Sequence, residues 1–138
     1  MRRRVGSARV ARLGTVDGDG RPHLVPICFA LVGDRLVTAV DHKPKRTTAL
    51  TRLEHVRAHP AVSVLVDEYD EDWDRLWWVR VDGDAAVVED VGTEPELLAA
   101  LVTKYAAYAE VPPAAAAIVV TVRGWQGWAA REDPRRAR

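Results

Sequence analysis

The chain is short of the features that mark several large classes of protein. It has a single cysteine, Cys28, among 138 residues, which excludes an intrachain disulfide and a cysteine-only metal cage. No apolar run approaches the roughly 18 residues of a membrane span, and the basic start of the chain leads into no apolar signal region. Lys plus Arg and Asp plus Glu number 20 each, so no basic excess supports binding to nucleic acid or to a membrane surface. We therefore expect a soluble, cytoplasmic protein.

The sequence also lacks the motifs of several enzyme classes. It contains no GxGxxG, GxxxxGK[ST], HExxH or GxSxG pattern, which disfavours a nicotinamide-binding Rossmann fold, a P-loop enzyme and a zinc hydrolase. Cys28 lies in an apolar segment without a nearby partner, so we interpret it as a small hydrophobic residue. The sequence predicts no metal site.

What is present indicates a mainly β protein. Alternating and β-branched runs separated by turn signals predict strands at residues 10–16, 23–31, 35–40, 61–66, 76–89 and 117–122. Short turns join the first three strands, which predicts an antiparallel meander. Helical patterns cover residues 47–59 and 93–108. Six or so antiparallel strands with two helices indicate an α+β fold built on a closed or partly closed barrel. We expect one domain over residues 1–130 and a flexible tail over 131–138.

Two residues mark irregular positions in these strands. Pro26 has no backbone N–H, which places it at a sheet edge or a bulge, where backbone groups stay open to a ligand. Gly83 interrupts a long strand and predicts a bulge or bend.

Tryptophan is frequent, with five in the chain. Trp77 and Trp78 are adjacent on one strand, so at least one of them points away from the core or toward its rim. Trp125 and Trp128 follow the last predicted strand. Such rings fit a stacking wall for a flat cofactor, the centre of a dimer interface, or ordinary core filling.

The most informative segment lies between the third strand and the first helix. Two of the three lysines, Lys43 and Lys45, fall here beside Arg46 and Thr47, whereas the rest of the chain relies on arginine. A helix N-terminus presents unpaired N–H groups and partial positive charge, so this segment suits a phosphate or carboxylate. The alternative is a solvated basic loop.

His23 is a candidate for contact with a planar ligand or for proton donation. It shares a strand face with Val25 by the two-residue alternation. The alternative is a partly buried histidine bonded to a neighbour. We assign no catalytic acid, and His23, Tyr69 and Arg80 are the candidates.

Taken in order, these segments resemble the split β-barrel flavin and deazaflavin oxidoreductases, the superfamily named after pyridoxamine 5'-phosphate oxidase. The resemblance is carried by residues 11–16, 20–26, 36–40, the basic segment and residues 59–63. The acidic and tryptophan-containing stretch 66–80 is similar to an actinobacterial branch that uses cofactor F420, a 5-deazaflavin. Relatives usually have a short helix before the first strand, whereas only a few residues precede it here.

The resemblance implies a homodimer whose cofactor lies in a groove between subunits. Lys45 matches the lysine that binds the cofactor phosphate in the family. The other implied contacts come from the same segment and the neighbouring strands: His23, Val25, Pro26, Thr38, Ala39, Val40, Lys43, Arg46, Thr47 and, completing the pocket, Trp78. The implied activity is transfer of a hydride between reduced F420 and a small organic substrate.

Two alternatives remain open. The first is an FMN-dependent oxidase or reductase on the same barrel. The second is a non-catalytic module that binds a flavin or haem, for which the available axial ligands are His23, His42, His55 and His59.

Overall fold

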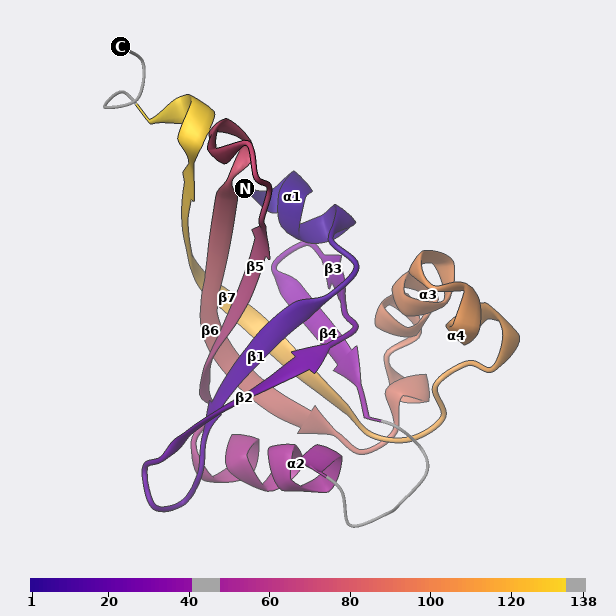
Figure 1. Ribbon diagram of the computed structural model, residues 1–138. Helices are drawn as coiled ribbons and strands as arrows, with labels where there is room; N and C mark the ends of the chain where they lie inside the picture. The colour runs from indigo at the N-terminus through magenta and orange to yellow at the C-terminus, as the bar shows by residue number, and fades with distance from the viewer. Residues whose placement is uncertain (41–47, 134–138) are drawn as a thin grey trace.

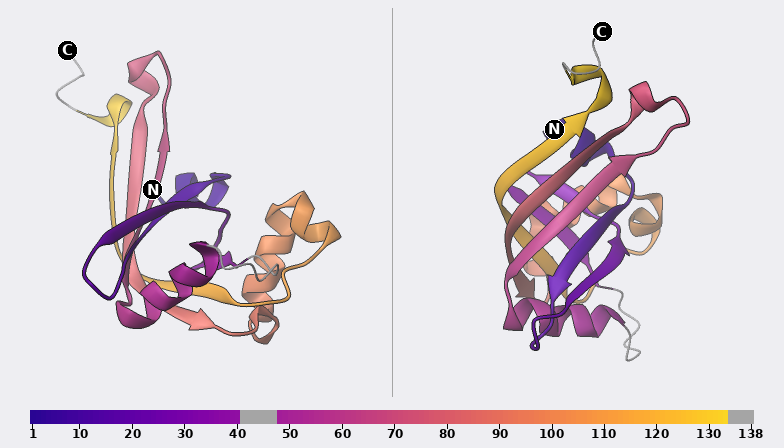
Figure 2. Two further views of the ribbon diagram at one scale, coloured as in Figure 1. Left: turned by 60° about the horizontal axis from the view of Figure 1, so that its bottom comes forward. Right: turned by 60° about the vertical axis from the view of Figure 1, so that its left-hand side comes forward.

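The computed structural model describes residues 1–40 and 48–133 of the chain (Figure 1). An antiparallel sheet curls there into a half-barrel, which confirms the expected α+β split-barrel class (Figure 2). The sheet has the strand order β2-β1-β5-β6-β7-β4-β3. The strands are β1 (Ala11–Val16), β2 (Pro22–Ile27), β3 (Ala30–Val32), β4 (Arg35–Ala39), β5 (Ala61–Glu68), β6 (Trp77–Val88) and β7 (Ala117–Ala129).

Short helices surround this sheet. In the described residues they are α1 (Arg2–Ser7), α2 (Thr48–Ala58), α3 (Pro95–Lys104) and α4 (Ala106–Glu110), with 3-10 turns η1 (Trp73–Arg75), η2 (Val91–Thr93) and η3 (Ala130–Glu132). Helix α2 packs against β1 and β6, whereas α3 packs against β3 on another side of the barrel (Figure 1). None of the described helices is long and apolar enough to cross a membrane.

The first strands do not form the predicted meander. Cys28 and Phe29 break the predicted strand at 23–31 into β2 and β3, which pair with β1 and β4 respectively. These two consecutive strands are the opposite edges of the sheet. Because only two residues separate them in the chain, the sheet must curl until its edges approach each other. Pro26 lies on the edge strand β2, as predicted.

Side-chain alternation divides the apolar residues between two cores. Leu36 of β4 and Val120 of β7 face the barrel interior, whereas their neighbours Val37 and Val119 face α3. The interior core also contains Leu13, Phe29, Val64, Val79, Val81 and Ile118, and the outer core contains Leu97, Leu101 and Tyr105. The barrel therefore packs on both faces of β4 and β7.

Several predicted boundaries differ from the structure. The predicted helix at 93–108 is two helices, because Tyr105 has an extended backbone (φ −118, ψ 123) between α3 and α4. Strand β7 continues to Ala129, so Trp125 and Trp128 lie on the strand rather than after it. The register of β6 against β7 shifts at Asp82/Gly83, which confirms the predicted bulge.

Short helical segments lie near both ends of the described chain. Helix α1 occupies the short segment before β1. Ala130–Glu132 form η3, and the buried Asp133 accepts a hydrogen bond of 2.9 Å from Trp128 Nε1. Residues 134–138 of the expected tail lie outside the described residues.

Candidate functional site

The curled sheet creates a cavity between the end of β2 and the end of β4. Its volume is about 290 Å³. The lining includes four residues that the sequence singled out, Pro26 from β2 and Thr38, Ala39 and Val40 from the end of β4. We call it the β2/β4 cavity. Its two walls come from strands that are far apart in the sheet order and meet only because the sheet curls.

The β4 wall of this cavity is held firmly in place. Thr38 is buried and pairs with Ile118 of β7. The N–H of Val40 donates a hydrogen bond of 2.9 Å to the carbonyl of Ala116. These bonds fix the end of β4, so the cavity has a rigid wall on this side.

Arg52 of α2 is a residue of the β2/β4 cavity that the sequence analysis missed. Its Nε atom is buried and has no hydrogen-bond partner among the described residues. Burial lowers the pKa of the Arg52 guanidinium, yet arginine remains ionised in proteins. A half-buried cation with an unsatisfied N–H at a cavity wall suits an anionic ligand group.

A sequence signal for Arg52 does exist. Arg52 lies about one helical turn after Thr48, the first residue of α2, and therefore near the helix end for which the sequence predicts an anion site. Lys43, Lys45, Arg46 and Thr47, which carry that prediction, lie outside the described residues.

Three other predicted cofactor contacts are not part of the β2/β4 cavity. Val25 is half-buried and packs against the interior core. Trp78 lines a separate cavity of about 720 Å³, together with Arg4 and Trp128. His23 lies beside Asp17 and lines a third cavity, of about 530 Å³. Within one chain, Trp78 and the β2/β4 cavity are therefore in different places.

The two further candidates for a catalytic acid lie elsewhere as well. Tyr69 is exposed, and its hydroxyl donates a hydrogen bond of 3.2 Å to Glu71. Arg80 bonds both carboxylate oxygens of Asp82 and, at 2.7 Å, the side chain of Gln126. Neither residue lines the β2/β4 cavity.

The predicted haem ligands that the structure describes lie away from the β2/β4 cavity. His55 is buried and its Nδ1 lies 2.9 Å from the hydroxyl of Thr15, whereas His59 is exposed at the end of α2. His42 lies outside the described residues. No described histidine lines the β2/β4 cavity.

Cys28 differs from its interpretation as a plain hydrophobic residue. It is exposed, and it lines the β2/β4 cavity at the link between β2 and β3. The side chain therefore faces a ligand-sized space rather than the core.

The chain is similar to a known protein family and to several solved structures. Residues 1–129 match the protein family described as pyridoxamine 5'-phosphate oxidase. None of the curated proteins compared with the chain matches it significantly.

Solved structures give the same fold. A conserved hypothetical protein from Mycobacterium tuberculosis is 22% identical, with a TM-score of 0.72 over 94% of this chain and 82% of that one. A FAD-binding protein from Mesorhizobium loti is 24% identical, with a TM-score of 0.70 over 91% and 87%. The haem storage protein HutZ from Vibrio cholerae is 16% identical, with a TM-score of 0.62 over 86% and 84%.

Proposed function

The chain belongs to the pyridoxamine 5'-phosphate oxidase family, and from this premise we propose that it is an oxidoreductase that transfers a hydride between the deazaflavin cofactor F420 and a small organic substrate. The observation that carries the proposal is the position of Arg52. Its guanidinium is half-buried at the β2/β4 cavity, with an N–H that has no partner in the described part of the chain. An anionic cofactor group would supply that partner.

The residues of the β2/β4 cavity fit such a cofactor. Arg52 offers a cation, and the end of β4 offers a rigid wall of small and branched side chains against which a flat ring can lie. The volume of about 290 Å³ falls at the lower limit of ligand pockets, which span about 300–1,000 Å³. One chain therefore encloses part of a cofactor, and a second chain is needed to cover the rest.

The protein's contribution is binding and orientation. A bound deazaflavin supplies two-electron hydride chemistry. Arg52 binds the anionic part, aided by Lys45 and Lys43 as the sequence analysis expects. The end of β4 positions the ring, and Pro26 on the opposite wall excludes water from it. This division of roles requires neither a nucleophilic side chain nor a catalytic triad.

A flavin is the second candidate cofactor. The Mesorhizobium loti relative is a FAD-binding protein, and FMN also carries a phosphate that Arg52 could bind. Haem receives support from the Vibrio cholerae relative, a haem storage protein. No histidine among the described residues lines the β2/β4 cavity, and His42, two residues after Val40, lies outside them.

We include a homodimer in the proposal, because one outer face of the sheet exposes two large apolar side chains. Leu24 of β2 is 76% exposed and lies opposite Gly14 of β1. Leu65 of β5, which is also exposed, lies opposite Arg12 on the same face. We call this the β2–β1–β5 face. A second copy packed there would bury these side chains.

Side-by-side titration of the ligand-free protein with F420, FMN and haem tests the proposal. We expect one F420 to bind per chain, with an affinity at least tenfold higher than that for FMN or haem. Reduced F420 should then be oxidised in the presence of an acceptor substrate. If FMN binds more tightly than F420, FMN is the cofactor instead. If none of the three binds, the proposed function is refuted.

A further inference from the structure

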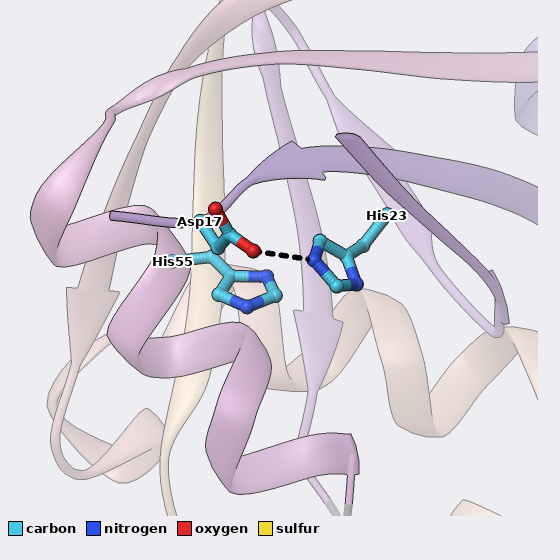
Figure 3. Close-up of side chains that lie close together, drawn as sticks. All are labelled: Asp17, His23 and His55. Atoms are coloured by element: carbon cyan, nitrogen blue, oxygen red, sulfur yellow. Dashed lines mark hydrogen bonds and ion pairs between the residues drawn. The ribbon is translucent and has the colours of Figure 1, made fainter. Parts of the chain in front are cut away.

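A cluster of three potential metal ligands lies outside the β2/β4 cavity. Asp17 is in the turn after β1, His23 is on β2 and His55 is on α2. Figure 3 shows the three side chains close together, with Asp17 bonded to His23 and the His55 ring beside them. One potential ligand atom from each residue lies within 4.8 Å of the other two. Residues 1–40 and 48–133 contain no other group of this kind.

The turn after β1 fixes the carboxylate of Asp17. Its Oδ1 accepts hydrogen bonds of 2.9 Å from the backbone N–H groups of Asp19 and Arg21. Its Oδ2 lies 2.9 Å from Nε2 of His23. One oxygen is therefore used to hold the carboxylate in place, and the other faces the imidazole.

Helix α2 brings His55 to the same place. The ring is 7% exposed, and its Nδ1 lies 2.9 Å from the hydroxyl of the buried Thr15. Its centroid is 4.5 Å from that of the His23 ring. The bond to Thr15 fixes the orientation of the ring and uses Nδ1, so a metal ion bound through that nitrogen would replace the bond.

Two imidazoles and one carboxylate form a donor set for zinc and related divalent metals. We propose that Asp17, His23 and His55 bind one Zn²⁺ ion per chain. Zinc–ligand bonds of about 2.0–2.2 Å place tetrahedral ligand atoms about 3.3 Å apart. To reach that geometry, the metal would be inserted between Asp17 Oδ2 and His23 Nε2, which lie 2.9 Å apart as a hydrogen-bonded pair.

The site would be of the open type. Three protein ligands leave the fourth tetrahedral position for water or another small ligand. His23 is exposed and also lines the cavity of about 530 Å³, so solvent can reach this position. A structural zinc site would instead use four protein ligands and be closed.

The bound ion would join β2 to α2. These two elements also carry Pro26 and Arg52 of the β2/β4 cavity. His55 and Arg52 are three residues apart on the helix, which is about 4.5 Å of rise. Zinc would therefore hold Arg52 in position, although zinc binding itself does not depend on the proposed cofactor.

Metal titration of the full chain tests the site without any cofactor. After chelator treatment and dialysis, calorimetry with Zn²⁺ and absorption spectroscopy with Co²⁺ should both give one ion per chain. We expect a dissociation constant in the micromolar range or below, and visible Co²⁺ bands of four- or five-coordinate geometry. Failure of the unmodified protein to bind one ion in this range would overturn the proposal.

Variants locate the bound ion. Asp17→Asn and His23→Ala change residues of the exposed hairpin, and each should weaken Zn²⁺ binding at least 30-fold. His59→Ala removes an exposed histidine just beyond α2 and should leave the affinity unchanged. Unchanged affinity in the first two variants, or an equal loss in His59→Ala, would refute the assignment. If a variant does not fold, as judged by circular dichroism, the Co²⁺ titration of the unmodified protein decides.

Discussion

The hydroxyl of Tyr105 accepts a hydrogen bond of 3.0 Å from the backbone N–H of Phe29, at the break between the two edge strands of the sheet. The same hydroxyl donates to the carbonyl of Arg9 at 2.9 Å. Phe29 is fully buried, so its N–H needs a partner inside the protein. Tyr105 thus joins the α3–α4 junction to the place where the barrel edges meet.

Replacing Tyr105 by phenylalanine removes the hydroxyl that contacts the N–H and carbonyl of Phe29 and the carbonyl of Arg9, and it leaves the buried N–H of Phe29 unsatisfied. We expect Tyr105→Phe to lower the free energy of unfolding by about 1–3 kcal/mol, the cost of an unsatisfied buried group. Urea unfolding measures the change. Tyr69→Phe is the control, because that exposed hydroxyl bonds only a surface glutamate. Equal stability of the two variants would contradict this role of Tyr105.

The bulge in β6 requires glycine at position 83. A β-carbon at Gly83 would clash with the carbonyl oxygen of Thr121 and would lie 2.7 Å from Cγ1 of Val120. We expect Gly83→Ala to cost about 1–3 kcal/mol of stability, as in other overpacked sites. Gly124→Ala is the matched control on β7, since a β-carbon there meets nothing within 4 Å. Equal melting temperatures of the two variants in thermal unfolding would show that the β-carbon at position 83 causes no clash.

The pH dependence of stability should reveal Lys104. Burial, followed by the nearby charge of Arg9, lowers the pKa of Lys104 from 10.5 to about 8. Between these two values the unfolded chain binds more protons than the folded one, so the free energy of unfolding rises with pH across the window from 8 to 10.5. The gain should be modest, because Lys104 is partly exposed to solvent and solvent screens its charge.

Lys104→Met isolates this contribution. The ammonium lies 3.8 Å from the centre of the Phe29 ring, and methionine preserves much of the apolar contact. We expect the variant to lack the gain in stability between pH 8 and 10.5 that the unmodified protein shows in urea unfolding. Identical pH slopes in the two proteins would disprove the assignment.

Arg52 should contribute more to cofactor binding than any other arginine of α2. We expect Arg52→Ala to weaken binding of F420 or FMN by about 1.5–3 kcal/mol, the range for a hydrogen bond to a charged group. Arg57→Ala is the control on the same helix, because its guanidinium pairs with Glu89 at the surface. Fluorescence titration of each variant measures the dissociation constant. Equal affinities would place the anion site elsewhere.

The oligomeric state should depend on the β2–β1–β5 face. Light scattering of the unmodified protein should give twice the chain mass of 15.3 kDa. Leu24→Lys places a charge on this face and should yield the single-chain mass. Val111→Lys changes another exposed apolar residue, 59% exposed, and should remain dimeric. A dimer that survives Leu24→Lys would exclude this face as the interface.

Local patterns predicted much of the fold. Strand periodicity located most of the sheet, and the positions of Pro26 and Gly83 were correctly predicted as irregular because each depends on the chemistry of one residue. The predicted meander was wrong. The segment expected to be one strand is split into β2, which pairs with β1, and β3, which pairs with β4, because the curl of the whole sheet decides which strands become neighbours. The prediction of one long helix was wrong, because the helix breaks at Tyr105. The Tyr105 hydroxyl there bonds the backbone of Phe29, a residue far away in the sequence.

The candidate sites divide in the same way. Local patterns established which residue types were available: strand residues Thr38 to Val40, a proline on an edge strand, and two lysines shortly before a predicted helix. They did not identify Arg52, or the meeting of Asp17 with His55, since these depend on where α2 packs against the barrel. Hydrogen-bonding patterns and turn chemistry act between near neighbours in the chain, so the sequence records them. Convergence of residues from the turn after β1, from β2 and from α2 arises only when burial of the apolar core folds distant segments together, so it cannot be read from the order of residues in the chain.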